Sequence, residues 1–225
     1  MISKNLFNII SRFLNLCEND SGSPETEYNK IYIYKDGNGG RKQLTLSRGF
    51  TCDGGNLKKV VVRYIQKGGI LSDMFKKRLD KFGKGILISD TEFIKGLVSA
   101  GTEQAMKDAQ DEIFNEVYLG PAIKWADINR FKENLSIAVI ADSYLHSGQM
   151  TPFLMQKFSE KKPGSGGDEK IWIKSYLEQR LAWFERVSGP LHTCMFRPQF
   201  FLNEIEKDNW ELSCPLTVKE KGKIC

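Results

Sequence analysis

The sequence lacks any apolar run of about 20 residues, the length that a helix needs to cross a bilayer. Its first residues, 1–13, place Lys4 and Arg12 among apolar side chains at helical spacing, unlike the uninterrupted core of an export signal. We therefore expect no membrane insertion and synthesis in the cytoplasm without a Sec signal. If the substrate lies outside the cell, the protein then needs release or delivery, and the sequence does not identify a delivery or virion partner.

Histidine and cysteine are scarce and are not spaced for metal chemistry. The two histidines, His146 and His192, lie far apart, and the five cysteines form neither a CxxC pair nor a Cys/His zinc pattern. We expect no metal and no cofactor. The odd number of cysteines argues against a full disulfide framework, although a bridge between Cys17 and Cys52 remains open.

Strong charge of one sign is also missing. The net charge is +5, and the basic residues are scattered rather than gathered in the dense run typical of nucleic-acid-binding proteins. We expect no nucleic-acid partner. The 225 residues are 40% hydrophobic, enough for a sizeable core in one domain or in two lobes that share a cleft.

The apolar periodicity that is present predicts a mainly helical chain with one β-hairpin. The hairpin lobe spans about residues 28–51, with strands at 28–35 and 43–50 around a glycine-rich turn. A helical body takes residues 1–18 and 55–205, and a polar tail follows at 206–225. The expected fold class is α+β, mainly α, as a single domain over 1–225 with a substrate cleft between two lobes.

Two acids near the start stand out as candidates for chemistry. Glu18 ends the first apolar helix, and Asp36 lies in the hairpin turn. Glycoside hydrolysis uses two carboxyl groups, one of which protonates the leaving oxygen while the other activates water. The simpler interpretations are a surface acid at a helix end and an ordinary Asp-Gly turn. A glutamate at a helix C-terminus opposes the helix dipole, which favours a functional reason for Glu18.

Other side chains of the hairpin lobe are weaker candidates. Thr45 lies on the return strand, where its hydroxyl would help to hold a water, but a plain strand threonine fits equally. Arg48 either reaches the cleft or is a solvated surface arginine. Tyr28, Tyr32 and Tyr34 share one face by alternation and are candidate sugar platforms.

These residues, in order, resemble a known family. The pattern is Glu18-Asn19, Tyr28, Ile31, Asp36-Gly37, Thr45 and Gly49-Phe50, and it continues through Asp108–Asp111, Pro121-Ala122, Asp142-Ser143, Arg180, Arg197, Asn209 and Leu212–Leu216. It is similar to the family 46 chitosanases of the lysozyme-like superfamily over about residues 5–216. The resemblance implies a lysozyme-like fold and an inverting glycosidase.

The resemblance also implies roles for particular residues. Glu18 would be the general acid, Asp36 the base that activates water, and Thr45 a residue that positions this water. Asp142, Arg180 and Arg197 would form a buried charge network behind Glu18, because unpaired buried charge is too costly to keep.

Two departures from the family pattern affect the substrate. Eight residues, 37–44, separate Asp36 from Thr45, which lengthens the hairpin. Where chitosanases tend to place an acid after the Gly-Phe segment, this chain has Asn56, with Asp53 close by. A neutral amide suits an acetamido sugar better than a cationic one. Tyr28, Tyr32, Tyr34, Arg48 and Asn56 are thus the expected substrate contacts.

We therefore expect hydrolysis of a β-1,4-linked amino-sugar polymer, with bacterial peptidoglycan as the leading substrate. This would make the protein an endolysin or antibacterial effector that acts on the cell wall outside the cytoplasm. The first alternative is a chitosanase that acts on chitosan. The second is a non-catalytic cell-wall-binding or structural protein.

Overall fold

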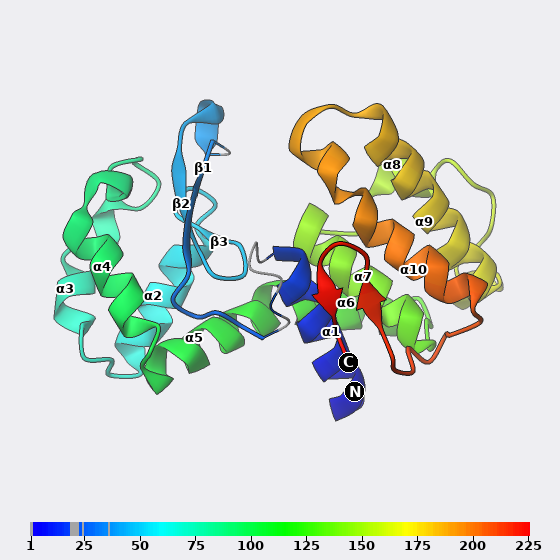
Figure 1. Ribbon diagram of the computed structural model, residues 1–225, viewed down its shortest axis with the longest axis horizontal. Helices are drawn as coiled ribbons and strands as arrows, with labels where there is room; N and C mark the ends of the chain where they lie inside the picture. The colour runs from blue at the N-terminus through cyan, green and yellow to red at the C-terminus, as the bar shows by residue number, and fades with distance from the viewer. Residues whose placement is uncertain (1, 19–22, 24, 36) are drawn as a thin grey trace. The chain divides into compact units, whose positions relative to one another are not determined.

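The computed structural model describes residues 2–18, 23, 25–35 and 37–225 (Figure 1). The chain divides into two compact units. Unit 1 comprises Met1–Pro24 and Val117–Cys225, and unit 2 is the continuous stretch Glu25–Glu116. Most described residues are helical and the sheets are small and antiparallel, which confirms the mainly α, α+β class.

The sheet of unit 2 contains the predicted hairpin. Strands β1 (Ile31–Tyr34), β2 (Gln43–Leu46) and β3 (Phe50–Thr51) pair antiparallel in the order β1-β2-β3. All four residues of β2 are buried, as expected of a central strand, while β1 lies at the edge. Ile33 on β1 is 47% exposed, so the alternation does not bury its isoleucine face throughout.

Further helices of the same unit follow β3 in the chain. They are α2 (Asn56–Gln66), α3 (Ser72–Lys76), α4 (Thr91–Ala100) and α5 (Gln104–Phe114), with short 3₁₀ segments at Asn38–Gly40, Leu79–Lys81 and Leu87–Ser89. Helix α2 contacts both α5 and β3. The sequence predicts a helical body that includes residues 55–205, whereas residues 55–114 belong to the same compact unit as the hairpin. A sheet of three short strands cannot bury Leu44, Leu46 and Phe50 alone, so these helices complete its core.

Unit 1 is helical around a buried central helix, α7 (Asn134–Ser147). Helix α7 contacts α1 (Lys4–Glu18), α6 (Gly120–Ile128), α9 (Glu169–Arg186) and α10 (Phe196–Glu206). The remaining elements are the π-helical segment Asn115–Leu119, which carries the chain from unit 2 into unit 1, α8 (Pro152–Met155) and 3₁₀ turns at Pro163–Ser165 and Gly189–Met195. Asp168 caps α9 by accepting a hydrogen bond from the Ile171 amide at 2.9 Å.

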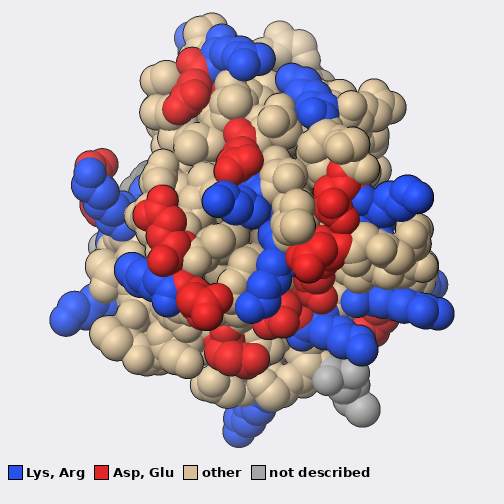
Figure 2. All heavy atoms as spheres, turned by 90° about the vertical axis from the view of Figure 1, so that its right-hand side faces the viewer, with Lys and Arg blue, Asp and Glu red and all other residues tan. Residues whose placement is uncertain are grey.

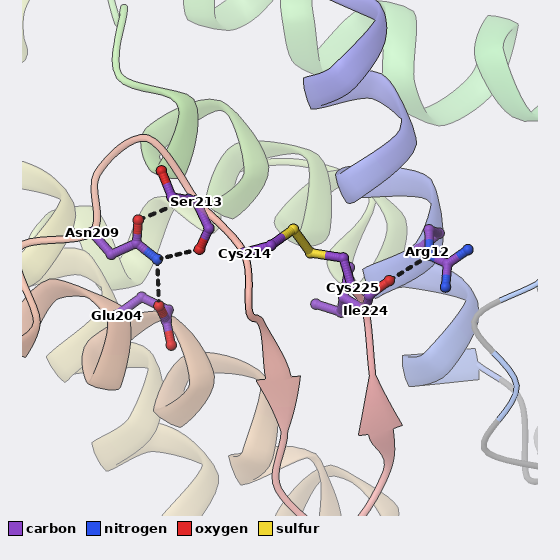
Figure 3. Close-up of a disulfide and its surroundings, with 7 residues drawn as sticks. All are labelled: Arg12, Glu204, Asn209, Ser213, Cys214, Ile224 and Cys225. Carbon is purple, nitrogen blue, oxygen red and sulfur yellow. Dashed lines mark hydrogen bonds between the residues drawn. A yellow bond between two sulfur atoms is a disulfide. The ribbon is translucent and has the colours of Figure 1, made fainter.

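The C-terminal tail is more ordered than its polar sequence predicts. It forms a second sheet from β4 (Thr217–Val218) and β5 (Gly222–Lys223), and a disulfide joins Cys214 to Cys225 with their Cα atoms 5.7 Å apart. In Figure 3 this bridge lies beside Arg12 of α1, whose Nε donates a hydrogen bond to the Ile224 carbonyl. A disulfide within the tail and a hydrogen bond from the distant Arg12 order a stretch that has little apolar periodicity of its own.

The bridge that the sequence left open, between Cys17 and Cys52, is not formed. Both residues are buried free thiols. Burial raises the pKa of each, to about 12 for Cys52, which keeps the thiols protonated at neutral pH. Among the described residues, none of the helices is both long and apolar enough to span a bilayer.

Candidate active site

Glu18 is the last residue of α1, at the end of a helix face that is otherwise buried. Leu14 and Leu16 are at most 1% exposed, whereas the Glu18 side chain remains 23% exposed. Its Oε1 accepts a hydrogen bond from the guanidinium of Arg197 on α10. The helix thus presents a carboxyl group that is solvent-accessible on one side and bound to a fixed cation on the other.

Behind Glu18 lies a chain of buried charges, all within unit 1. Arg197 Nη1 donates to Asp142 Oδ1 at 2.6 Å, and Arg180 Nη1 donates to Asp142 Oδ2 at 2.6 Å. The side chains of Asp142 and Arg180 are fully buried, and that of Arg197 is 3% exposed. The structure therefore brings together all four residues that the resemblance grouped. The Asp142 carboxylate lies between two guanidiniums, which lessens the cost of burying these charges.

The charges of this group shift the pKa of Asp142, which is one of its members, and of the nearby His146. Burial disfavours the charged form of Asp142, but Arg180 and Arg197 outweigh it and hold the pKa of this carboxyl below its usual value. His146, on the last turn of α7, has a pKa lowered to about 3 by burial and by the same two arginines. Its neutral ring packs edge-on against Phe184, with centroids 5.4 Å apart.

In unit 2, one face of the sheet collects the predicted hairpin residues. Thr45 pairs with Tyr32 across β1 and β2, and Gln43 pairs with Tyr34, so these side chains share a face. The rings of Tyr32 and Tyr34 stack with centroids 5.8 Å apart. Thr45 is 6% exposed, and its hydroxyl has no hydrogen-bond partner among the residues that the structure describes. A buried unpaired hydroxyl of this kind is a suitable water ligand.

Arg48 is neither a solvated surface arginine nor an open cleft residue, because its side chain is 4% exposed. Its Nη2 donates to Asp111 Oδ1, and its guanidinium lies 4.3 Å from the centre of the Phe114 ring. Tyr28 donates its hydroxyl proton to Asp111 Oδ2 at 2.9 Å, and its pKa is raised by burial and by this carboxylate. Arg48 and Tyr28 therefore meet on Asp111, 63 residues along the chain from Arg48, a partner that no local pattern indicated.

The remaining candidates belong to the hairpin turn and its surroundings. Asp36 lies outside the described residues, so its role rests on the sequence. Asn56 begins α2 and is partly buried. Asp53, the acid considered beside Asn56, is 3% exposed and accepts a hydrogen bond from Arg41 Nε at 2.8 Å. The sequence does not predict this ion pair, because strands β2 and β3 separate Asp53 from Arg41 along the chain.

Two further features bear on the site, namely clusters of metal-ligating side chains and the distribution of charge on the surface. No cluster of three or more His, Cys, Asp and Glu residues in the described part of the chain is placed to hold a metal ion. Figure 2 shows one face of the molecule with basic and acidic side chains interspersed rather than segregated.

Comparison with known proteins adds a family to this geometry. The family model described as glycosyl hydrolase family 46 matches residues 12–216. A chitosanase of Bacillus subtilis (strain 168) is 28% identical over 176 residues, which cover 72% of this chain and 61% of that relative. The chain thus spans about three-fifths of the length of this curated relative.

Solved structures show the same fold. The native chitosanase of Bacillus subtilis MY002 superposes with a TM-score of 0.84 at 22% identity, covering 99% of this chain and 98% of that one. A chitosanase of Gynuella sunshinyii in complex with chitotetraose superposes with a TM-score of 0.82 at 20% identity, covering 96% and 94% of the two chains. The expected lysozyme-like architecture is therefore confirmed. Since the family model spans most of its length, the chain belongs to glycosyl hydrolase family 46.

Proposed function

We propose that the protein is a glycosidase that hydrolyses chitosan, the β-1,4-linked polymer of glucosamine. The observation that carries this proposal is the buried network behind Glu18 in a chain of this family. Arg197 contacts Glu18 and Asp142 at once, and Arg180 holds Asp142 from its other side. Such a network fixes one carboxyl group in place at the end of a rigid helix, as a general acid requires.

In the proposed reaction, Glu18 donates a proton to the glycosidic oxygen as the bond to the anomeric carbon breaks. Asp36 removes a proton from a water molecule, whose oxygen attacks that carbon from the opposite face and inverts its configuration. The two carboxyl groups of an inverting enzyme stand roughly 6.5–9.5 Å apart, which leaves room for the water. The unpaired hydroxyl of Thr45 supports a role in holding this water.

Chitosan replaces peptidoglycan as the leading substrate. Asn56, which stands where the family tends to have an acid, favours an acetamido sugar and hence peptidoglycan. The related proteins found by comparison are chitosanases, and none of these findings supports an endolysin or an antibacterial effector. Chitosanase, first held as the alternative, therefore fits better. Action of the protein on a substrate outside the cytoplasm remains a prediction.

The experiment compares the release of reducing ends from purified chitosan and purified peptidoglycan by wild type, Glu18→Gln and Asp36→Asn. We expect turnover of chitosan by wild type alone, since each variant keeps its shape but loses a proton-transfer group. Proton NMR of the first product anomer tests inversion. If wild type cleaves peptidoglycan but not chitosan, chitosan is not the substrate. Full activity of both variants would refute the roles of Glu18 and Asp36. Binding of either polymer without cleavage would favour the non-catalytic alternative.

A further inference from the structure

Asp111, on α5, carries a carboxyl group that two donors hold in place but that stays open to solvent. Arg48 Nη2 donates to its Oδ1, and the Tyr28 hydroxyl donates to its Oδ2 at 2.9 Å. The Arg48 side chain is 4% exposed, whereas the Asp111 side chain is 46% exposed. The cation is thus buried in unit 2, while the carboxylate that it holds remains accessible to a ligand from solvent.

Arg48 and Tyr28 are themselves held in place within unit 2. The Arg48 guanidinium lies 4.3 Å from the centre of the Phe114 ring and 5.8 Å from that of the Tyr28 ring. The Gln110 side-chain amide donates to the Tyr28 carbonyl at 2.7 Å. Because both donors are fixed, Asp111 keeps one orientation before any ligand arrives, so a ligand binds without the entropic cost of ordering it.

Neutralisation of Arg48 does not by itself account for the exposure of Asp111. Asp142 neutralises two arginines in unit 1, and its side chain is fully buried. An ionised carboxyl group offers about four acceptor sites. Among the residues that the structure describes, only Arg48 and Tyr28 donate hydrogen bonds to Asp111. Asp111 therefore keeps acceptor sites for a donor that comes from solvent.

We propose that Asp111 binds the ammonium group of a glucosamine unit of chitosan, an inference that rests on the function proposed above. An ammonium group is a cation with donors only, so it forms charge-assisted hydrogen bonds with a fixed carboxylate. The acetamido group of N-acetylglucosamine is neutral and its carbonyl oxygen is a further acceptor, so it matches Asp111 less well. Tyr28, an expected sugar contact, lies against the same carboxylate. Asp111 is then a specificity residue, and Arg48 and Tyr28 position it.

Calorimetric titration of the Glu18→Gln variant tests this site, because its ligands stay uncleaved. The probes are tetramers of glucosamine and of N-acetylglucosamine, in weakly acidic buffer where the glucosamine amino groups are protonated. Adding Asp111→Asn should raise the Kd of the glucosamine tetramer roughly 10-fold to 100-fold, because a hydrogen bond to a charged group is lost. The N-acetylglucosamine tetramer should bind to both proteins alike.

Glu112→Gln is the matched control, because Glu112 is the next residue of α5 and has nearly the same exposure. Its side chain is 44% exposed and pairs with Arg63 and Lys67 of the same unit. The control removes a carboxylate from the same helix but leaves the contacts of Asp111 intact. It should therefore leave the Kd of both tetramers unchanged.

Tyr28→Phe is a second variant, in which the ion pair between Arg48 and Asp111 is retained. Asp111→Asn leaves the buried charge of Arg48 without a carboxylate and so also destabilises unit 2. Tyr28→Phe removes only the hydroxyl donor that orients Asp111. The Kd of the glucosamine tetramer should therefore rise by a smaller factor, about 3-fold to 10-fold. An unchanged Kd would overturn the positioning role of Tyr28.

NMR of the side-chain carboxyl carbons reports contact with the ligand directly. Addition of the glucosamine tetramer to Glu18→Gln should shift the Asp111 signal and leave the Glu112 signal in place. An unshifted Asp111 signal, an unchanged Kd in Asp111→Asn, or an equal loss of affinity for both tetramers would each overturn the proposal. If wild type cleaves no chitosan yet binds the glucosamine tetramer through Asp111, the proposed function fails and the binding site stands. Cleavage of chitosan without any dependence of binding on Asp111 gives the reverse outcome.

Discussion

At the scale of single residues, the buried charges of unit 1 are the most constrained part of the protein. Asp142 receives hydrogen bonds from two guanidiniums, and Arg197 contacts two carboxyl groups. Removal of one partner leaves a buried charge without compensation, which costs more than the pair contributes when intact. Stability and catalysis are therefore coupled at these positions.

Arg180 provides the direct test of this coupling. We expect Arg180→Ala to lower the free energy of unfolding by about 3–5 kcal/mol, because the buried Asp142 loses one of its two guanidinium partners and keeps only Arg197. Activity at a temperature where the variant is folded should fall as well, since Arg197 and Glu18 lose their support. Urea denaturation and chitosan assays measure the two effects. Unchanged melting together with unchanged turnover would show that the network supports neither.

His146 should make stability depend on pH in the weakly acidic range. Its pKa is about 3 in the folded protein, as against about 6.5 in an unfolded chain, so the folded state keeps the ring neutral. As pH falls below about 6.5, the unfolded state binds a proton that the folded state does not. The free energy of unfolding then falls by about 1.4 kcal/mol per pH unit until the pH reaches the pKa of His146 in the folded protein.

The control for this prediction is His146→Gln, which cannot titrate. Denaturation curves at pH 7, 6, 5 and 4 should give a flatter profile for the variant than for wild type. Asp142 acts in a separate window, because its lowered pKa stabilises the fold above about pH 4 and this contribution is lost only at lower pH. Parallel profiles for the two proteins between pH 6 and 4 would contradict the assignment to His146.

At the scale of elements, the C-terminal hairpin shows how a short polar segment becomes ordered. Strands β4 and β5 have two residues each, too few to be stable alone. The disulfide closes the segment, and Asn209 secures its start by donating to Glu204 at 2.7 Å and accepting from the Ser213 amide at 2.8 Å (Figure 3). Arg12 then joins its end to α1, the helix that carries Glu18.

Loss of the disulfide should destabilise unit 1. Closing an 11-residue separation restricts the unfolded chain by about 2–3 kcal/mol in the chain-entropy model. We expect the double variant Cys214→Ser, Cys225→Ser to lose this amount in urea denaturation, and reduced wild type to match it. Reductant should have no further effect on the double variant. Equal stability of oxidised and reduced wild type would mean that the bridge does not restrain the unfolded chain.

At the scale of the whole molecule, two compact units divide the candidate residues between them. Glu18 and its charge network belong to unit 1, while Tyr32, Tyr34 and Thr45 belong to unit 2. Because each unit has its own buried core, damage to one should be confined to it if the units unfold separately.

Hydrogen exchange of the Arg180→Ala variant tests whether the two units unfold separately. Amides of α7 and α9 in unit 1 should lose protection by up to about 3–5 kcal/mol, whereas amides of α2 and α5 in unit 2 should keep theirs. Arg63→Ala offers the reverse case, with any smaller loss confined to unit 2. An equal loss of protection throughout the chain would instead show that the units unfold as one.

The sequence by itself determined the features that depend on near neighbours. Helical and alternating periodicity located most helices and the hairpin, placed Tyr32 and Tyr34 on one face of their strand, and put Glu18 at a helix end. These follow from backbone geometry that repeats every few residues. The charge network was foreseen only through family resemblance, since Glu18 and Arg197 lie 179 residues apart.

Only the tertiary structure decided which distant side chains meet. It buried Arg48 against Asp111, paired Arg41 with Asp53, joined Cys214 to Cys225 and placed the helices 56–114 with the hairpin. Each outcome depends on how complete elements pack, because a charge or a thiol takes the partner that packing brings within reach. Local sequence shows that such a side chain needs a partner once buried, but the fold selects which one it receives.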